Sequence, residues 1–464
     1  MRIRSLFFIL TELMLALLVC RADENPGASS LRWICSTPTA PWKELPASGA
    51  SEATAVPQAA PITVDEKTTY QTMDGFGGCF NDLGWQALLT LDESARAAAL
   101  KELFDPGDAN FTLGRAAMGA NDFALEWYSF DETPGDYGMN DFSIEHDREH
   151  LIPYMKAAMA YQPKLGIWGV PWSPPSWMKT NGGYKGGNMK QDAQTLAAYA
   201  LYFSKYVQAY RAEGIHLYAI HPQNEPNYNT GNYPQCAWTG EELDGFVRDY
   251  LLPQLKKDKV KIEVWFGTDA GGQKVVNAVE HDPIAMSQIT GFGYQYGGQK
   301  ILLSTHEHFP DKKLAQTETE CFNGKNTWDE GLLTFKHIIA DTNNFAGSYF
   351  FWNLVLNETG TSTWHWRQNS LLTVDRTTKS VRYNSEFYSM KHFSANVLPG
   401  AKRIAVSGGP FTDMVAFQNP SGSRVVLFEN ATAQAVSATL KTSGGPVKLD
   451  VPAKSMNTVT LGGG

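Results

Sequence analysis

The sequence predicts an α/β fold in which a (β/α)₈ barrel carries an antiparallel β-sandwich domain. From about residue 75 onward, short β-like runs alternate with helical stretches, which is the signature of βαβ units. Beyond about residue 375, the pattern changes to short segments of alternating polarity separated by Gly, Pro, Asn and Ser turns, as in antiparallel β domains. The 464 residues are enough for a barrel of about 250 residues or more and a smaller second domain.

The first 22 residues have the pattern of a signal peptide. Met1–Arg4 is basic, and Ser5–Val19 is a mostly apolar run that is too short to span a bilayer. Cys20 and Ala22 are small residues that suit cleavage just before Asp23. We therefore expect a secreted or periplasmic protein. No later run of 18 apolar residues predicts a transmembrane segment in the mature chain.

Two segments separate this peptide from the barrel. Residues 23–60 are rich in Ala, Pro, Ser and Glu and are predicted to be an N-terminal extension or linker. Residues 61–72 begin with the β-like run Ile62–Val64, and we expect them to form a strand that joins the β domain. The barrel is assigned to residues 73–393 and the sandwich mainly to residues 394–464.

The barrel segment contains eight β-like runs, the number that the fold requires. They are Gly75–Phe80, Phe111–Met118, Lys164–Trp172, Leu217–Glu225, Lys261–Thr268, Gly291–Tyr296, Lys313–Glu318 and Gly347–Leu356. Helical patterns fall between them, for example over Asp92–Leu103 and Gln194–Arg211. In the sandwich, the β-like segments are Val415–Phe417, Ser423–Phe428, Ala435–Leu440 and Thr458–Leu461.

Charge and cysteine content exclude some classes of function. The 39 basic and 48 acidic residues give a net charge of −9, which argues against nucleic acid or an anionic membrane as the partner. Behind the signal peptide, the scattered Cys35, Cys79, Cys236 and Cys321 lack a Cys-x-x-Cys spacing, so we predict no structural zinc site. They allow up to two disulfides, in one of three pairings, or none. The 13 Trp and 19 Tyr suit either sugar stacking or a large aromatic core.

Two carboxylates lie at predicted strand ends. Glu225 closes the run Tyr218–Pro226, and Glu318 closes the seventh predicted strand. The chemistry of a (β/α)₈ barrel takes place at the carboxyl ends of its strands, where side chains from different strands converge. A pair of carboxyl groups at one mouth is what a glycosidase needs, and their mutual repulsion separates their pKa values. We therefore predict a glycosidase.

Several motifs resemble those of glycoside hydrolase family 30, the family of glucosylceramidases. They span residues 75–369 in the family's order: Gly75–Gly78, Gly114-Arg115 with Asp122 seven residues after the arginine, Pro171–Gly182, Asn224–Pro226, Thr305-His306 with Phe309-Pro310, Thr317-Glu318, Trp352-Asn353 and Trp366–Asn369. The resemblance implies a retaining enzyme in which Glu225 is the acid/base and Glu318 the nucleophile. It also implies a sugar-binding ring of Asp122, Trp172, Asn224 and Trp352, with Asn224 on the 2-hydroxyl group. No metal and no organic cofactor is expected.

The identity of the nucleophile has an alternative in Glu320. Residues two apart on a strand point the same way, about 6.6 Å from each other, so Glu318 and Glu320 both qualify. The spacing of thirteen positions between Thr305 and Glu318 matches the family without a gap, which favours Glu318.

Four further residues are expected near the substrate. Tyr294 and Tyr296, at the end of the sixth strand, are candidates for orienting the nucleophile or lining the aglycone site, with packing as the alternative. His306 is expected to support the nucleophile strand, because His306-Glu307-His308 is too compact for a helical metal site. Asn369 ends the aromatic-rich loop that starts at Trp364, and loops concentrate binding residues.

The expected substrate is a carbohydrate or glycoconjugate with a β-linked glucoside. An endo-β-1,6-glucanase or a β-xylosidase on the same scaffold is the alternative within the enzymes, and an inactive carbohydrate-binding protein is the alternative outside them. Loop shape and subsite length decide between these activities. Resemblance to a family that includes several activities does not choose among them.

Overall fold

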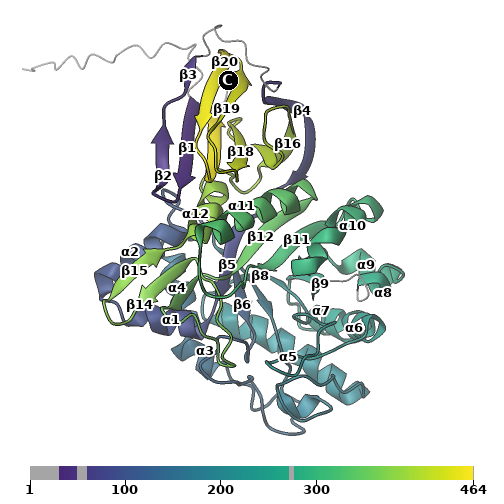
Figure 1. Ribbon diagram of the computed structural model, residues 1–464. Helices are drawn as coiled ribbons and strands as arrows, with labels where there is room; N and C mark the ends of the chain where they lie inside the picture. Colours follow the sequence, from purple (N-terminus) through teal and green to yellow (C-terminus); the bar gives the residue numbers. More distant parts are fainter. Residues whose placement is uncertain (1–30, 50–59, 271–275, 463–464) are drawn as a thin grey trace, which may run out of the picture.

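The computed structural model describes residues 31–49, 60–270 and 276–462. The predicted signal peptide lies outside the described residues. Figure 1 shows a barrel surrounded by helices, with a β domain at one end of it. No helix in these three stretches is long and apolar enough to cross a membrane.

The predicted barrel is confirmed. Eight strands close in the order β10-β11-β12-β5-β6-β7-β8-β9, and every neighbouring pair is parallel. They are β5 (Gly75–Phe80), β6 (Leu113–Ala117), β7 (Gly166–Val170), β8 (Leu217–Ile220), β9 (Glu263–Ala270), β10 (Gly291–Gln295), β11 (Lys313–Thr319) and β12 (Ala346–Asn353). All eight overlap the predicted runs. The eighth predicted run divides into β12 and a short β13 (Val355–Asn357).

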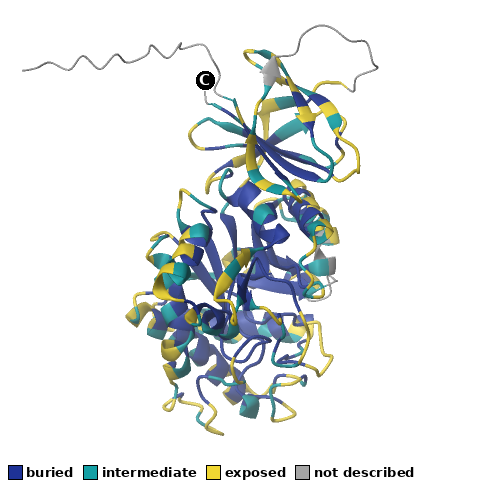
Figure 2. Ribbon diagram, turned by 60° about the vertical axis from the view of Figure 1, so that its left-hand side comes forward, coloured by how far each residue is buried: buried dark blue, intermediate teal, exposed yellow. Residues whose placement is uncertain are grey.

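Glycines let the barrel strands approach each other closely. A β-carbon on Gly77 would lie 1.8 Å from the carbonyl oxygen of Leu113 on β6, which no larger residue can tolerate. Figure 2 shows that the strands are buried, whereas the surrounding helices expose their outer faces. The closely packed, buried strands form a rigid frame for side chains at the strand ends.

The helices that surround the barrel begin with recognisable caps. Asp92 and Asp192 accept a hydrogen bond from the backbone of the first turns of α2 and α5, and Thr327 forms a capping box with Glu330 at the start of α11. The α-helices of the described chain are α1 (Asp82–Leu89), α2 (Glu93–Phe104), α3 (Glu145–Glu149), α4 (Leu151–Met159), α5 (Ala193–Ala212), α6 (Gly240–Phe246), α7 (Leu252–Lys257), α8 (Val276–Val279), α9 (Pro283–Gln288), α10 (Leu302–His308), α11 (Trp328–Asn343) and α12 (Ser385–Ser394). Short 3-10 or π turns are η1 (Ser176–Met178), η2 (Val247–Leu251) and η3 (Tyr296–Ile301).

The β domain consists of a seven-stranded and a three-stranded sheet, with strand orders β2-β1-β21-β18-β17-β16-β4 and β19-β20-β3. Its strands are β1 (Leu31–Thr37), β2 (Ala40–Leu45), β3 (Ser48–Gly49), β4 (Thr63–Thr72), β16 (Lys402–Ser407), β17 (Met414–Gln418), β18 (Arg424–Asn430), β19 (Val436–Thr442), β20 (Gly445–Val451) and β21 (Ser455–Leu461). As predicted, the strand before the barrel joins this domain, because β4 pairs with β16. A separate small sheet contains β13, β14 (Leu372–Asp375) and β15 (Ser380–Tyr383).

The linker predicted for residues 23–60 is wrong for Leu31–Gly49. β1 pairs with both β2 and β21, and its residues Trp33–Ser36 are buried. β21, more than 400 residues away, is the second neighbour of β1 and makes it a central strand of the sheet. The many Ala, Pro and Ser residues around β1 led to the prediction of a linker.

The β domain packs against α11 and α12. His392 on α12 is fully buried in this contact and hydrogen-bonds Ser36 on β1 and Thr458 on β21, at 2.9 and 2.8 Å. The four cysteines of the described residues, at positions 35, 79, 236 and 321, are all buried and free, so none of them forms a disulfide with another.

Candidate active site

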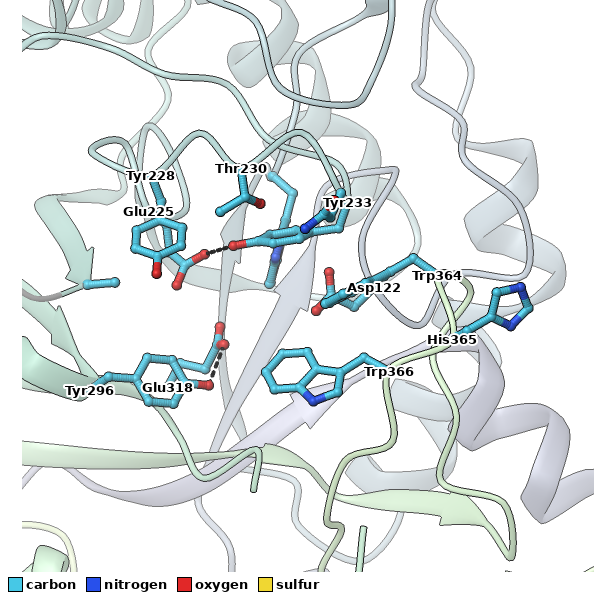
Figure 3. A pocket seen from close by; sticks show the side chains of 13 residues that line it. Asp122, Glu225, Tyr228, Thr230, Tyr233, Tyr296, Glu318, Trp364, His365 and Trp366 are labelled. Carbon is cyan, nitrogen blue, oxygen red and sulfur yellow. Dashed lines mark hydrogen bonds between the residues drawn. The ribbon is translucent and has the colours of Figure 1, made fainter. Parts of the chain in front are cut away.

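A cavity of about 720 Å³ opens at the carboxyl ends of the barrel strands. Its lining comes from the ends of seven strands or from the loops that follow them. Figure 3 shows the lining side chains from close by. The residues that line it are Asp122, Trp172, Glu225, Tyr228, Thr230, Asn232, Tyr233, Ala270, Tyr296, Glu318, Trp364, His365 and Trp366. Both predicted carboxylates are therefore in one cavity, and they turn toward one another.

Glu225 lies in the loop after β8, and among the described residues its carboxyl group hydrogen-bonds a neutral donor alone. The Tyr233 hydroxyl donates to its Oε2 at 2.7 Å. Burial raises the pKa of Glu225 to about 7, and the charge of Glu318 adds to the increase, against smaller opposing effects of Tyr233 and Arg115. The backbone of Glu225 has a φ of 45°, in the left-handed region. Residues other than glycine adopt this conformation rarely, and it is often found at functional sites.

Glu318, on β11, has a cation and a hydroxyl as partners. Arg115 on β6 donates to its Oε2 in a buried ion pair, and the Tyr296 hydroxyl donates to its Oε1 at 3.0 Å. The two carboxyl groups of the cavity thus differ in their surroundings, because Glu318 has a counter-ion, whereas no described cation contacts the carboxyl group of Glu225.

Arg115 connects β11, which contains Glu318, with the loop after β8, which contains Glu225. Besides Glu318, its guanidinium group donates to Oδ1 of Asn224, which also accepts from Gln295 at 2.8 Å. The guanidinium carbon lies 4.5 Å from the ring centroid of Trp172 and 5.4 Å from that of Trp352, so aromatic faces cover it. We did not predict a role for Arg115 from the sequence, although a charged residue inside an otherwise apolar strand was a usable signal.

Three of the four residues of the expected sugar-binding ring, Trp172, Asn224 and Trp352, contact this arginine. Asp122 and Trp172 line the cavity, whereas Asn224 and Trp352 are buried beside Arg115 and do not. The rings of Trp172 and Trp352 are 5.1 Å apart. The pKa of Asp122 is raised well above its ordinary value by burial and then by the charges of Glu318 and Glu225.

Glu320 points away from the cavity. Its carboxylate is paired with His337 on α11, and Glu318 is the one of the two acids that lines the cavity. β11 ends at Thr319, and its pairing with β12 is irregular between Gln316 and Thr319. The two-residue alternation of a regular strand therefore does not extend to Glu320.

The prediction that Tyr294 lies near the substrate is wrong. Tyr296 lines the cavity, but the fully buried Tyr294 contacts Thr305 on α10 through its hydroxyl, at 2.7 Å. β10 ends at Gln295, and its register with β11 shifts after Tyr294, so two tyrosines two residues apart point to different places. Tyr294 is a packing residue.

His306 and Asn369, which we also expected near the substrate, do not line the cavity either. His306 lies on α10 and stacks on Phe345, with ring centroids 3.5 Å apart. Phe345 directly precedes β12, so this contact is at the amino ends of the strands, opposite the cavity. Asn369 is fully buried and holds its loop in place, accepting from the backbone of Gly324 at 2.7 Å and donating to Glu386.

The loop after β12 nevertheless contributes to the cavity through its aromatic residues. Trp364, His365 and Trp366 line it, and Trp364 stacks on Tyr233 with centroids 5.4 Å apart. Tyr233 and Tyr228 belong to the loop after Glu225, and sequence reasoning missed both. The sequence did contain a signal for them, because Tyr and Asn are frequent just after Glu225.

A barrel of this type, whose mouth contains two carboxyl groups among tryptophan and tyrosine rings, defines a glycoside hydrolase. The model of the glycosyl hydrolase family 30 TIM-barrel domain matches residues 73–397, and that of the glycosyl hydrolase family 30 beta sandwich domain matches residues 400–459. The chain therefore belongs to glycosyl hydrolase family 30.

Proteins named for two different activities are similar to this chain over most of their length. The mouse lysosomal acid glucosylceramidase is 27% identical over 82% of this chain and 79% of its own. Endo-1,6-beta-D-glucanase neg1 of Aspergillus fumigatus is 29% identical over 86% of this chain and 87% of its own. The solved structure of the endo-beta1,6-glucanase BT3312 has a TM-score of 0.82 and 25% identity, covering 94% of this chain and all of that one.

Proposed function

We propose that the protein is a secreted retaining β-glycosidase that hydrolyses β-linked glucosides by double displacement. The observation that supports this is the contrast between the two carboxyl groups of one cavity. Glu318 is ion-paired with Arg115, whereas burial raises the pKa of Glu225 to about 7, so that it still holds a proton near neutral pH. Such a pair suits an ionised nucleophile and a protonated acid.

In the first step, a carboxylate oxygen of Glu318 attacks the anomeric carbon, and the bond to the leaving oxygen breaks as Glu225 protonates that oxygen. In the second step, Glu225 takes a proton from water, whose oxygen attacks the anomeric carbon and releases Glu318. The hydrogen bonds from Arg115 and Tyr296 hold Glu318 in place for both steps. Asp122, Trp172 and Asn224 are proposed to bind the sugar.

A second candidate within the same mechanism is endo-acting hydrolysis of a β-1,6-glucan. Two aromatic side chains that line the cavity remain open to solvent, Tyr228 with 45% and Trp366 with 38% of its surface exposed. Aromatic faces at a cavity mouth suit either an additional sugar unit or the apolar part of a glycoconjugate. Similarity to both a glucosylceramidase and an endo-1,6-glucanase is consistent with either substrate.

Product analysis tests the proposal. We expect hydrolysis of nitrophenyl β-glucoside, and proton NMR of the fresh reaction should show the β-anomer of glucose before mutarotation. Glucosylceramide, β-1,6-glucan and xylo-oligosaccharides, assayed in parallel, separate the candidates, because a ladder of oligomers would indicate an endo-enzyme. The Glu225→Gln variant is the control. The α-anomer as first product would exclude a retaining mechanism, and no turnover of any substrate would indicate a sugar-binding protein.

The pH dependence of the reaction should report the environment of Glu225. Because its pKa of about 7 is raised above the ordinary value, the protonated acid is present below that pH and is lost as the pH rises through it, so kcat/KM should fall above about pH 7. The Tyr233 hydroxyl lowers this pKa by donating to the carboxylate. Tyr233→Phe should therefore move the basic limb of the pH profile to higher pH. A shift to lower pH would contradict this role.

A further inference from the structure

Lys179 is a buried lysine in the loop between β7 and α5. Its ammonium group donates three hydrogen bonds, to the hydroxyl of Ser173 at 3.1 Å and to the backbone carbonyls of Tyr184 and Gln235 at 2.7 and 2.5 Å. Only 1% of its surface is exposed, and no carboxylate forms an ion pair with it among the described residues. Three acceptors satisfy its three N–H groups, which no neutral side chain of that length can do.

Two of these acceptors belong to loops that must remain together. Tyr184 is in the loop after β7, and Gln235 is in the loop Pro226–Trp238 that follows Glu225. The carbonyl oxygen of Tyr184 also accepts from the backbone of Gln235 at 3.0 Å, and Gly187 accepts from Ala237 at 2.9 Å. Lys179 thus completes a junction between the two loops.

Gln235 links the Lys179 junction to the part of its loop that lines the cavity. Its side-chain oxygen accepts from the backbone amides of Thr230 and Gly231, both at 3.0 Å, and so closes the turn that contains Tyr233. Tyr233 in turn donates to Glu225 at 2.7 Å. A continuous series of bonds therefore runs from the ammonium group of Lys179 to the carboxyl group of Glu225.

We infer that Lys179 is a positioning residue for the acid/base, because it holds the loop Pro226–Trp238 where Tyr233 can hydrogen-bond Glu225. The inference rests on the proposed function of Glu225. Burial lowers the pKa of Lys179 to about 8, and the charges of Cys236 and Glu132 oppose this effect. As the pH rises above that value, Lys179 loses its charge and its bonds to the loop weaken. A neutral amine has one donor fewer for the same three acceptors.

Hydrogen exchange and kinetics of Lys179→Met test the inference. The amides of Thr230, Gly231 and Gln235 should exchange faster than in the wild type, because their turn is released. With nitrophenyl β-glucoside, kcat/KM should fall about 10- to 100-fold, the scale of a misplacement of about 1 Å. The basic limb of the pH profile should move to higher pH, as in Tyr233→Phe, because the donor to Glu225 is weakened.

A double-mutant cycle separates positioning from general damage to the fold. If Lys179 acts through Tyr233, then Lys179→Met should reduce kcat/KM much less in the Tyr233→Phe background than in the wild type. Lys190→Met is the matched control, since this exposed lysine of the same loop bonds one carbonyl, that of Trp177 at 2.7 Å, and should leave kinetics and exchange unchanged. If the methionine variant does not fold, Lys179→Gln undergoes the same measurements.

The outcomes are distinct. Unchanged exchange in the loop, or effects of the two substitutions that simply multiply, would overturn the inference. If the wild-type protein hydrolyses no glycoside, the proposed function fails. The exchange experiment then still decides whether Lys179 holds the loop.

Discussion

Glu318→Ala should abolish hydrolysis of an activated aryl β-glucoside, and azide should restore turnover with inverted anomeric configuration. Azide can enter the space that the carboxylate leaves and attack from the nucleophile's side of the sugar, which yields the α-glycosyl azide. Glu225→Ala should instead yield the β-glycosyl azide, because azide then attacks the glycosyl-enzyme from the side of the missing acid/base. The loss of general acid catalysis alone is typically about 10²- to 10⁴-fold. NMR of the azide products measures the configuration.

Glu320→Gln is the control for this experiment, since Glu320 lies two residues from Glu318 but bonds His337 outside the cavity. It should retain most of the activity, with no effect of azide. Rescue of a Glu320→Ala variant with inverted product, together with none for Glu318→Ala, would transfer the role of nucleophile to Glu320.

Arg115→Met should reduce both stability and activity. The arginine is almost fully buried, and its removal leaves the carboxylate of Glu318 without a counter-ion in an apolar environment. Breaking a buried ion pair by removing one partner lowers the free energy of unfolding by about 3–5 kcal/mol. We also expect kcat/KM to fall about 10²-fold or more, because both Glu318 and Asn224 lose the group that orients them.

Urea unfolding measures the loss of stability, and two further variants interpret it. The double variant Arg115→Met, Glu318→Gln removes both charges and should be more stable than Arg115→Met alone, although inactive. Arg148→Met removes an arginine that pairs with Glu213 and Glu145 at the surface and should change stability by only about 1 kcal/mol or less. Equal losses for Arg115→Met and Arg148→Met would mean that burial of the pair has no special weight.

Local sequence patterns were sufficient for the regular parts of the fold. Most barrel strands are short runs of apolar and small residues between helical segments, so their positions were visible without their neighbours. The N-terminal strands were the exception. β1 and β2 lie in a segment rich in Ala, Pro and Ser, and β1 becomes a buried central strand because it pairs with β21 at the opposite end of the described chain.

The site was predictable at the general level of strand ends and the loops that follow them, and unpredictable where strand ends are irregular. Glu318 lines the cavity from the end of β11, and Glu225 lines it from the loop that follows β8. Alternation failed to distinguish Tyr294 from Tyr296 and Glu318 from Glu320, because both strands end or shift register between the paired residues. His306 was misplaced because α10 leads into β11 at the amino ends of the barrel.

By itself, the sequence determined the barrel, the family and the two glutamates, since each depends on patterns within a short stretch of chain. Only the tertiary structure decided what surrounds those glutamates. Arg115 lies 203 residues from Glu318, and Tyr233 meets Glu225 only because distant loops hold its own loop in place. Those neighbours set the charge and the pKa at the site through burial and contact, which are properties of the folded chain and of no segment taken alone.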